Sequence, residues 1–475
     1  MADTHSRAQS LLHEDRLFPA DPGIRKIARG LYESVRDLPI ISPHGHTDPR
    51  WFAENEPFGN PAELLLAPDH YIYRMLYSQG ISLDSLGVPG RSGKPDTDPR
   101  DAWRIFAENY HLFRGTPSRM WLDHVFEAVF GLTERLEAET ADTYFDAIDA
   151  ALKTEAFRPR ALFDRFNIEL LATTECPTDT LSHHQAIRES GWKGRVVSAY
   201  RPDAVVDPDH ERFQAALDEF ADLTGEDTRN WAGYLQAHRK RRQDFIAIGT
   251  TSSDHGHPAA TTADLSSSEA ECLFGKVVSS EASAGEREIF RGQMLTEMAR
   301  MSLDDGLVLQ IHPGAMRNHN HPLFLSHGRD KGADIPSATE YVQALRPLLN
   351  RFGNEPALSI IVFTLDETSY SRELAPLAGH YPALRLGPAW WFHDSPEGMR
   401  RFREQTTETA GFYNTVGFND DTRAFLSIPA RHDVARRVDC SFLARLVSEH
   451  RLAEDEAFQV ARALAYDLAK SAYRI

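Results

Sequence analysis

The sequence predicts an α/β fold, a distorted (β/α)8 TIM-like barrel with a helical insertion after its first strand. Eight short apolar runs recur along the 475 residues, segments with helical spacing separate them, and one gap is much longer than the others. Nearly continuous apolar runs are typical of parallel strands covered on both faces, and parallel neighbours need a crossover. An open doubly wound sheet would also accommodate eight runs, but eight strand–helix units favour the barrel.

The chain divides into a helical lead-in at 1–37 and a catalytic barrel domain at 38–475. The long gap at 48–165 is rich in aromatic residues at helical spacing, which predicts the insertion. We see no internal repeat and no linker that would split the chain further. The predicted strands, in chain order, are residues 38–41, 168–173, 195–199, 245–249, 307–311, 358–364, 384–388 and 414–417.

Several segments between and after these strands have a local signature. Apolar residues from 213 to 223 follow helical spacing, and Gly225 is placed where a C-terminal cap belongs. The Ser/Thr/Gly-rich stretch 249–268 predicts a loop after the fourth strand, whereas the Ser/Ala-rich stretch 260–285 has no clear interpretation. Two further helices are expected at the end of the chain, at 434–446 and 455–473.

Charge and cysteine content narrow the class of partner. Lys and Arg total 52 against 70 Asp and Glu, a formal net charge of -18, which repels phosphate backbones and anionic membranes. We therefore expect neither nucleic acid nor membrane as a partner. The polar N-terminus lacks a signal peptide, no apolar run approaches a membrane span, and three separated cysteines suit a reducing cytoplasm. Whether the chain forms a homo-oligomer stays open.

A His-x-His pair directly follows the first predicted strand. Side chains two apart on a strand face the same way, so His44 and His46 can converge on one metal ion. Taken alone, such a pair is equally well explained as two packed or solvated histidines. A second pair, His319 and His321, is interpreted as part of a surface loop because it lies in a Pro/Asn-rich stretch.

Polar residues suited to a site follow several other predicted strands. In a barrel these positions share the C-terminal rim, where active sites lie, and closure makes the eighth strand a neighbour of the first. Two histidines and one carboxylate with open positions form a typical catalytic divalent-metal site, most simply Zn²⁺. For the acidic pair after the eighth strand, a solvated turn or helix cap is the alternative. The rim residues are Arg201, Asp254, His255, His312, Arg317, Trp390, Trp391, Asp420, Asp421 and Arg423.

At these residues the chain resembles the amidohydrolase superfamily and, more closely, the uronate isomerase (glucuronate isomerase) family. The resemblance runs in order from about residue 10 to the C-terminus. In the familiar form of the last segment a neutral residue stands where Asp420 stands here, and we expect this added carboxylate to raise the pKa of Asp421. The segments that carry the resemblance are HGHTDPRWFAEN at 44–55, DHYIYRML at 69–76, AYRPD at 199–203, SSDHG at 252–256, QIHPGAMRN at 310–318, AWWF at 389–392 and DDTRAFLS at 420–427.

The resemblance implies a reaction and a set of roles. It implies interconversion of D-glucuronate and D-fructuronate, and of D-galacturonate and D-tagaturonate, by proton transfer from C2 to C1 through a cis-enediol. One divalent metal would be held by His44, His46 and Asp421, with the sugar carboxylate and a neighbouring hydroxyl on the ion. Asp421 would also be the base, Tyr71 the proton shuttle, and Arg423 the donor to the C2 and C3 hydroxyls.

The remaining candidates are assigned to the substrate. Arg201 would bind the anionic sugar or orient a rim carboxylate, with a surface ion pair as the alternative. The two tryptophans could form a platform for the sugar or pack in the core, and one of them could do each. The candidate substrate-binding residues are His70, Arg201, His312, Arg317, Trp390, Trp391 and Asp254.

Two other functions compete with the isomerase. A mononuclear metal-dependent hydrolase of the same superfamily is the first. Hydrolases with two metals often hold the second one with a Lys or Glu after the fourth strand and a His after the sixth. The predicted fourth strand ends in GTTSSD and the sixth in FTLDE, so neither Lys nor His stands where a second metal would need it. A noncatalytic sugar-binding or scaffold protein is the second, and the gathering of titratable groups at strand ends disfavours it.

Overall fold

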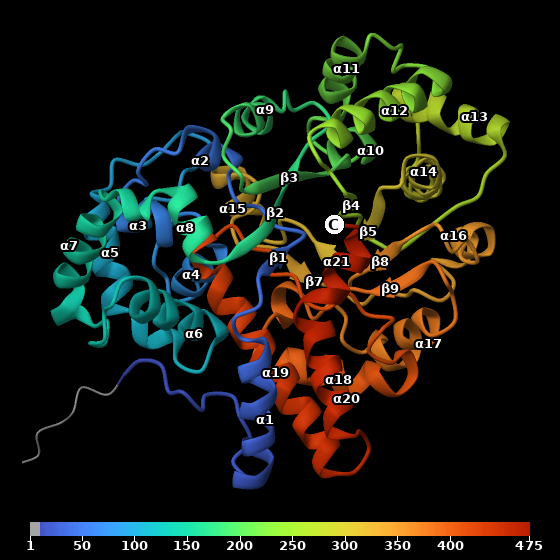
Figure 1. The fold of residues 1–475 in the computed structure, drawn as a ribbon. Helices are drawn as coiled ribbons and strands as arrows, with labels where there is room; N and C mark the ends of the chain where they lie inside the picture. Colours follow the sequence, from blue (N-terminus) through green and yellow to red (C-terminus); the bar gives the residue numbers. More distant parts are fainter. Residues whose placement is uncertain (1–9) are drawn as a thin grey trace, which may run out of the picture.

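The computed structural model describes residues 10–475, and its centre is a curled parallel sheet (Figure 1). The strand order in the sheet is β1-β2-β3-β4-β5-β8-β9, so the strands of this sheet are neighbours in the order in which they occur along the chain, with β6 and β7 outside it. This is the order that successive crossovers produce around a barrel. The strands are β1 (Ile40–Ser42), β2 (Ile168–Glu175), β3 (Arg195–Tyr200), β4 (Ser252–His255), β5 (Val308–Ile311), β8 (Ile360–Val362) and β9 (Leu384–Leu386).

The predicted eighth strand closes the sheet only loosely. One parallel bridge joins Thr415 to Leu386 of β9, and on the other side the backbone N–H of His46 donates to the carbonyl oxygen of Thr422 over 3.0 Å. The predicted distorted barrel is therefore confirmed, while the prediction of a regular strand at 414–417 is wrong. A single bridge is not a ladder of backbone hydrogen bonds, and an apolar run in the sequence cannot distinguish a regular strand from an extended segment with one bridge.

The fourth predicted strand is also wrong. Residues 245–247 are the last turn of α12 (Trp231–Ala247), with Phe245 fully buried in the core. The true strand, β4, lies within the predicted loop 249–268. Its sequence is Ser-Ser-Asp-His and all four side chains are buried. A strand that fills a barrel with polar side chains has no apolar pattern to read.

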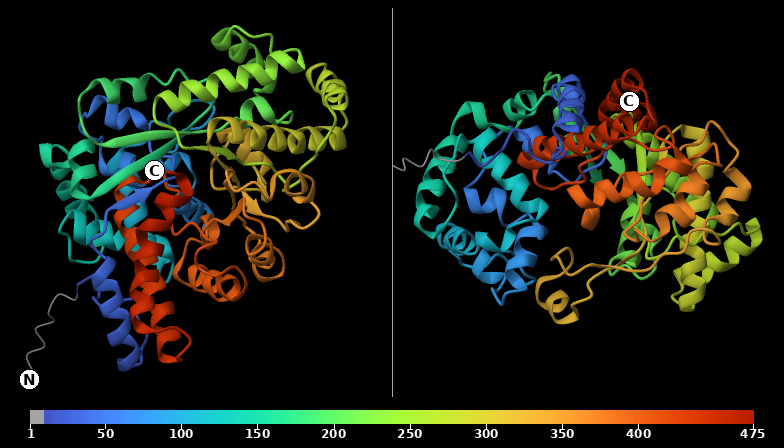
Figure 2. Two further views of the ribbon diagram at one scale, coloured as in Figure 1. Left: turned by 45° about the vertical axis from the view of Figure 1, so that its right-hand side comes forward. Right: turned by 90° about the horizontal axis from the view of Figure 1, so that it is seen from below.

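The helices between β1 and β2 form a group with its own apolar core, which includes Trp103, Phe106 and Ile148. Several begin with proline after a capping residue, as at Asp48 before Pro49, because proline suits the first helical position. Both views of Figure 2 show the group beside the sheet. Its helices are α2 (Pro49–Glu54), α3 (Pro61–Leu65), α4 (His70–Tyr77), α5 (Pro99–Glu108), α6 (Pro117–His124), α7 (Ala141–Leu152) and α8 (Pro159–Arg165).

The remaining helices surround the sheet on its other sides (Figure 1). A two-stranded hairpin, β6 (Ala315–Met316) and β7 (Ile335–Pro336), carries α15 between its strands. These helices are α1 (Pro22–Val35), α9 (Ser182–Glu189), α10 (Asp203–Val206), α11 (Phe213–Thr224), α13 (Ser267–Val278), α14 (Ala284–Asp305), α15 (His321–His327), α16 (Arg346–Phe352), α17 (Ala375–Ala378), α18 (Pro396–Ala410), α19 (Ile428–Ser448), α20 (Glu454–Arg462) and α21 (Leu468–Tyr473).

Several local expectations can be compared with these helices. The predicted helix near 213–223 is α11, and Gly225 caps it with φ 69°. The uninterpreted stretch 260–285 contains α13, which begins with a capping box between Ser266 and Glu269. In the lead-in, α1 packs against α19 and α20 through apolar side chains, and residues 1–9 lie outside the described part. Within residues 10–475, no helix is long and apolar enough to cross a membrane.

Candidate active site

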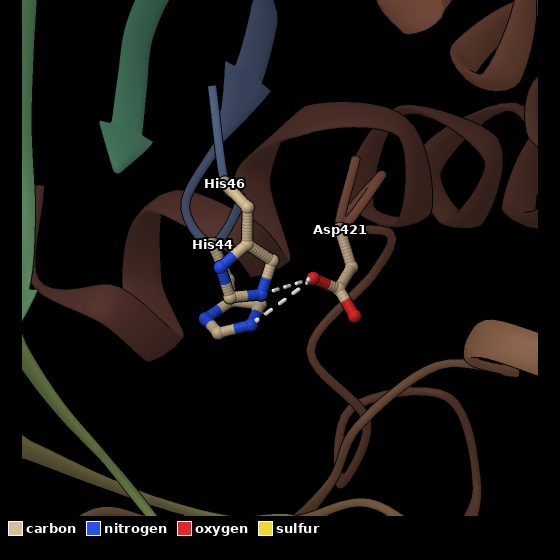
Figure 3. Close-up of side chains that lie close together, drawn as sticks. All are labelled: His44, His46 and Asp421. Atoms are coloured by element: carbon tan, nitrogen blue, oxygen red, sulfur yellow. Dashed lines mark ion pairs between the residues drawn. The ribbon is translucent and has the colours of Figure 1, made fainter. Parts of the chain in front are cut away.

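Three side chains converge where the first and eighth strand positions meet (Figure 3). The Nε2 atoms of His44 and His46 lie 3.3 and 3.1 Å from Oδ1 of Asp421. One ligand atom from each residue lies within 4.8 Å of the others. The two histidines belong to the segment after β1, and Asp421 follows the loose eighth strand, almost 380 residues later. Barrel closure brings them together.

Backbone contacts fix this segment. The Oγ1 of Thr174, at the end of β2, donates to the carbonyl of Gly45 over 2.8 Å. A Cβ on Gly45 would lie only 3.2 Å from the carbonyl oxygen of Ala172, so glycine lets the turn approach β2 closely. Asp421 has φ 37°, in the left-handed region, and the indole N–H of Trp390 donates to its Oδ2. Such a strained residue persists only when its surroundings hold it.

The donor set fits a divalent metal. The Oδ1 of Asp421 is buried and accepts no hydrogen bond, although two imidazole nitrogens face it. Burial alone would raise the pKa of Asp421, but the adjacent His44 and His46 hold that pKa well below its usual range. Burial lowers the pKa of His46, which keeps its imidazole neutral. Burial opposes protonation of His44 as well, but the carboxylates of Asp254 and Asp421 raise its pKa. A metal binds the carboxylate and the neutral imidazole, so its binding would release a proton from His44.

The expectation that Asp420 raises the pKa of Asp421 is wrong. Asp420 is buried, and its Oδ2 lies 3.0 Å from Nε2 of His432, a residue of α19. Its carboxylate therefore has a partner of its own. The two imidazoles that face Asp421 set the direction of its shift instead.

Asp254 lies behind the histidines. It is fully buried, its Oδ1 accepts a hydrogen bond from Nε2 of His312, and it lies 3.9 Å from Nδ1 of His44. His44, Asp254 and His312 form a second group whose ligand atoms lie within 4.8 Å. However, Nη1 of Arg201 lies 3.2 Å from Oδ2 of Asp254. A fixed positive charge there disfavours a second cation.

The triad opens into a cavity of about 650 Å³. Among the predicted substrate-binding residues, Asp254 does not line this cavity. The predicted residues that do line it are His44, His46, His70, Tyr71, Arg201, His312, Arg317, Trp390, Trp391, Asp421 and Arg423.

The insertion contributes His70 and Tyr71 at the start of α4. Asp69 caps this helix by accepting a hydrogen bond from the backbone N–H of Tyr71 over 2.8 Å. The two rings stack with centroids 4.5 Å apart. Burial lowers the pKa of His70 to about 3 and raises the pKa of Tyr71 well above its usual value. Both side chains are therefore neutral at pH 7.

The predicted arginines are each held by a carboxylate. Arg201 pairs with Asp203 at 2.9 Å as well as with Asp254. Arg423 pairs with Asp330 at 3.2 Å, on the segment between β6 and β7. Such pairs fix a guanidinium and leave its other donors available to a ligand.

Arg317, Trp390 and Trp391 also line the cavity. Arg317 pairs with Asp334 at 2.8 Å and lies 5.0 Å from the ring centroid of Trp391. Trp391 has φ 49° and a buried indole N–H without a partner, whereas Trp390 is almost fully buried and bonds Asp421. Trp390 therefore supports the site, and Trp391 offers a donor. His319 and His321, by contrast, are exposed, as the surface-loop interpretation expects.

Sequence reasoning missed several residues that support this site. They are Thr174, which holds the His-x-His turn, together with His432, Asp394 and Arg431. None has a motif that marks it. The only sequence signal was position, because Asp394 follows the seventh strand and Arg431 follows the eighth.

Comparisons with known proteins agree with this geometry. A family model described as glucuronate isomerase matches residues 21–473. A uronate isomerase of Phenylobacterium zucineum is 71% identical over 98% of this chain and 97% of that protein, and one of Xanthomonas campestris pv. campestris is 68% identical over 98% and 99%.

Solved structures show the same likeness. The crystal structure of glucuronate isomerase from Caulobacter crescentus has a TM-score of 0.97 at 68% identity and covers 98% of each chain. A uronate isomerase from Thermotoga maritima has a TM-score of 0.90 at 27% identity, over 97% of this chain and 99% of that one. A putative metal-dependent hydrolase from Lactobacillus casei, at 14% identity and a TM-score of 0.52, shares the fold alone.

Proposed function

The chain belongs to the glucuronate isomerase family, and from that premise we propose that its cavity interconverts D-glucuronate and D-fructuronate, and likewise D-galacturonate and D-tagaturonate. The family makes it an aldose–ketose isomerase. The observation that carries the proposal is the convergence of His44, His46 and Asp421 in a cavity that also contains Tyr71. The competing hydrolase function has no comparable support, since the hydrolase neighbour shares the fold alone.

One divalent metal, for which we propose zinc, would be held by His44, His46 and Asp421. Two imidazoles and one carboxylate are a common zinc donor set with open positions for a substrate. Bound there, the ion would polarise sugar oxygens as a Lewis acid. Asp254 would orient His44 from behind, as carboxylates commonly orient metal-binding histidines, which accords with its burial outside the cavity.

Asp421 and Tyr71 would move the protons. Asp421 removes the proton from C2 of the open-chain uronate, a C1–C2 double bond forms, and the carbonyl oxygen O1 takes a proton from the Tyr71 hydroxyl. The resulting phenolate then takes the proton of O2 as the C2 carbonyl forms. Asp421 returns its proton to C1. The sugar and both side chains then hold the same number of protons as before.

The other cavity residues would hold the sugar. Arg423, fixed by Asp330, can direct two N–H groups at the C2 and C3 hydroxyls because its donors are forked. Arg201 and Arg317 would contribute positive charge toward the anionic substrate, and the unpartnered indole N–H of Trp391 would donate to it. His70 and His312 would complete the polar lining. We place the enzyme in the cytoplasm, acting on free uronates.

Isotope transfer tests the proposal. D-glucuronate deuterated at C2 should lose its label to water or pass it to C1 of a ketose product, in step with turnover. A chelated preparation without metal is the control. Deuterium retained wholly at C2 while oxygen from water enters a cleaved product would indicate hydrolysis and contradict the isomerase.

A further inference from the structure

A buried cation lies beside the proposed proton shuttle and has no role in the reaction described above. Arg431, in the first turn of α19, is 1% exposed and lines the cavity. Its guanidinium carbon lies 3.6 Å from the ring centroid of Trp121 and 5.6 Å from that of Tyr71. The two aromatic rings meet edge to face, 5.7 Å apart. The cation thus contacts the aromatic pair of the insertion from the barrel side.

The same guanidinium contacts the strand ends. Its Nη1 donates to Oδ2 of Asp394, beyond β9, and to the backbone carbonyl of Asp420 at 3.4 Å. Its Nε donates to Ser427 Oγ at 3.1 Å. Asp420 directly precedes Asp421, the proposed base. One side chain therefore joins the segment that carries the base to the insertion, although about 350 residues separate the base and Tyr71 in sequence.

We propose that Arg431 is a positioning residue, which fixes the hydroxyl of Tyr71 relative to Asp421 and stabilises the phenolate that Tyr71 becomes between its two proton transfers. This inference rests on the shuttle role proposed for Tyr71. Proton transfer is efficient only when donor and acceptor are held at hydrogen-bond distance, and a side chain that contacts both segments helps to hold them there. A cation at the ring also favours negative charge on its oxygen.

The charges around Tyr71 agree with this role. Burial raises the pKa of Tyr71 well above its usual value, and Asp394, Asp421 and Asp69 act in the same direction. Arg431 is the neighbour that opposes them. Without this cation, an isolated phenolate at this depth would be strongly disfavoured.

A purely structural ion pair is the alternative, and the chain provides a matched control. Arg437 is on the same helix, is 5% exposed, and pairs with Asp433 at 2.9 Å. Its guanidinium carbon lies 4.2 Å from the ring of Tyr32. It therefore has the same kinds of contact as Arg431, but it does not line the cavity.

The test compares Arg431→Lys with Arg437→Lys, each alone and combined with Tyr71→Phe. Lysine keeps the charge and loses the forked donors. We expect Arg431→Lys to lower kcat at least about tenfold with a smaller change in KM and full metal content, since acid–base groups contribute about 10²–10⁴-fold. In the Tyr71→Phe background the same change should lower kcat less than about twofold, because residues that act as a unit are not additive. Arg437→Lys should lower the melting temperature but leave kcat nearly unchanged.

The outcomes separate this inference from the function on which it rests. Equal losses from Arg431→Lys in both backgrounds, or an unchanged kcat, would overturn the positioning role alone. Full activity of Tyr71→Phe would reject the shuttle and the inference with it. If Arg431→Lys does not fold, Asp394→Asn leaves Arg431 in place while removing its carboxylate. It should show the same non-additivity with Tyr71→Phe, and additive losses there would also overturn the role.

Discussion

Asp421 and Tyr71 can be distinguished because only one of them is a proposed metal ligand. Asp421→Asn keeps the shape of the side chain but removes the base and weakens the metal site, so we expect turnover to fall by about 10⁴-fold or more. Tyr71→Phe removes one hydroxyl, so turnover should fall while metal content stays complete. Turnover measured beside elemental analysis checks both, and a Tyr71→Phe protein that lost its metal would contradict the division of roles.

The cavity arginines should matter more than the overall charge of the protein. At a net charge of -18, an anionic sugar is bound only where local cations gather. Arg201→Met and Arg423→Met should therefore lower kcat/KM strongly, by at least about tenfold each, as expected when a hydrogen bond to a charged group is lost. Arg188→Met, on the exposed side of α9, is the control and should have little effect. Similar kinetics in all three variants would argue against the assignment.

Individual site residues could be predicted from the sequence where a motif or a position after a predicted strand marked them. His44 and His46 were singled out because they follow a strand two residues apart. Barrel closure predicted that the acidic pair Asp420 and Asp421 lies beside them, and the family resemblance selected Asp421. Arg431 was missed because its role depends on contacts with an insertion that begins hundreds of residues earlier. No spacing along the chain encodes such contacts.

The helix α4 matters because its first turn positions Tyr71, and its cap can be tested. Asp69→Ala removes the acceptor for the Tyr71 N–H and should cost about 1 kcal/mol of stability. Asp98→Ala is the matched control, since Asp98 caps α5 of the same insertion through Arg100 N at 2.7 Å. We expect similar falls in melting temperature, but a lower kcat only for Asp69→Ala. Equal kcat values in the two variants would show that the cap does not position the shuttle.

A strand could be predicted from the sequence where its buried side chains are apolar. The strands β2, β5 and β8 are apolar because helices and the barrel interior cover both faces, so their runs stood out. β4 has the same burial with polar side chains, since Asp254 must reach His44 and His312, and its signal was therefore lost. The predicted fourth strand was therefore misplaced, although β4 carries a buried part of the site.

For the molecule as a whole, buried histidines predict loss of stability in acid. Burial lowers the pKa of His70, His184 and His255 to about 3, 4 and 3. An unfolded histidine takes up its proton near pH 6.5. Below that pH the unfolded chain therefore binds more protons than the folded chain. Each of these histidines then lowers the free energy of unfolding by up to about 1.4 kcal/mol per pH unit.

Two buried carboxyl groups act against this trend. Burial raises the pKa of Glu175 and of Asp394 to about 7, above their unfolded values of about 4. Between pH 7 and about 4.5 these groups are protonated in the folded chain only, so they add stability as the pH falls. Burial also lowers the pKa of further histidines, His238 among them. Histidines with a lowered pKa therefore outnumber these carboxyls, and we expect the free energy of unfolding to fall between pH 6.5 and 4.5.

Urea unfolding at pH 7, 6 and 5 checks this balance, with the unfolding free energy expected to fall toward acid. His184→Gln provides the internal test, because His184 is a buried residue of α9 and does not line the cavity. Removing this histidine should flatten the slope by up to about 1.4 kcal/mol per pH unit. A slope that was the same in this variant would mean that His184 titrates alike in both states, and that the acid sensitivity arises from other groups.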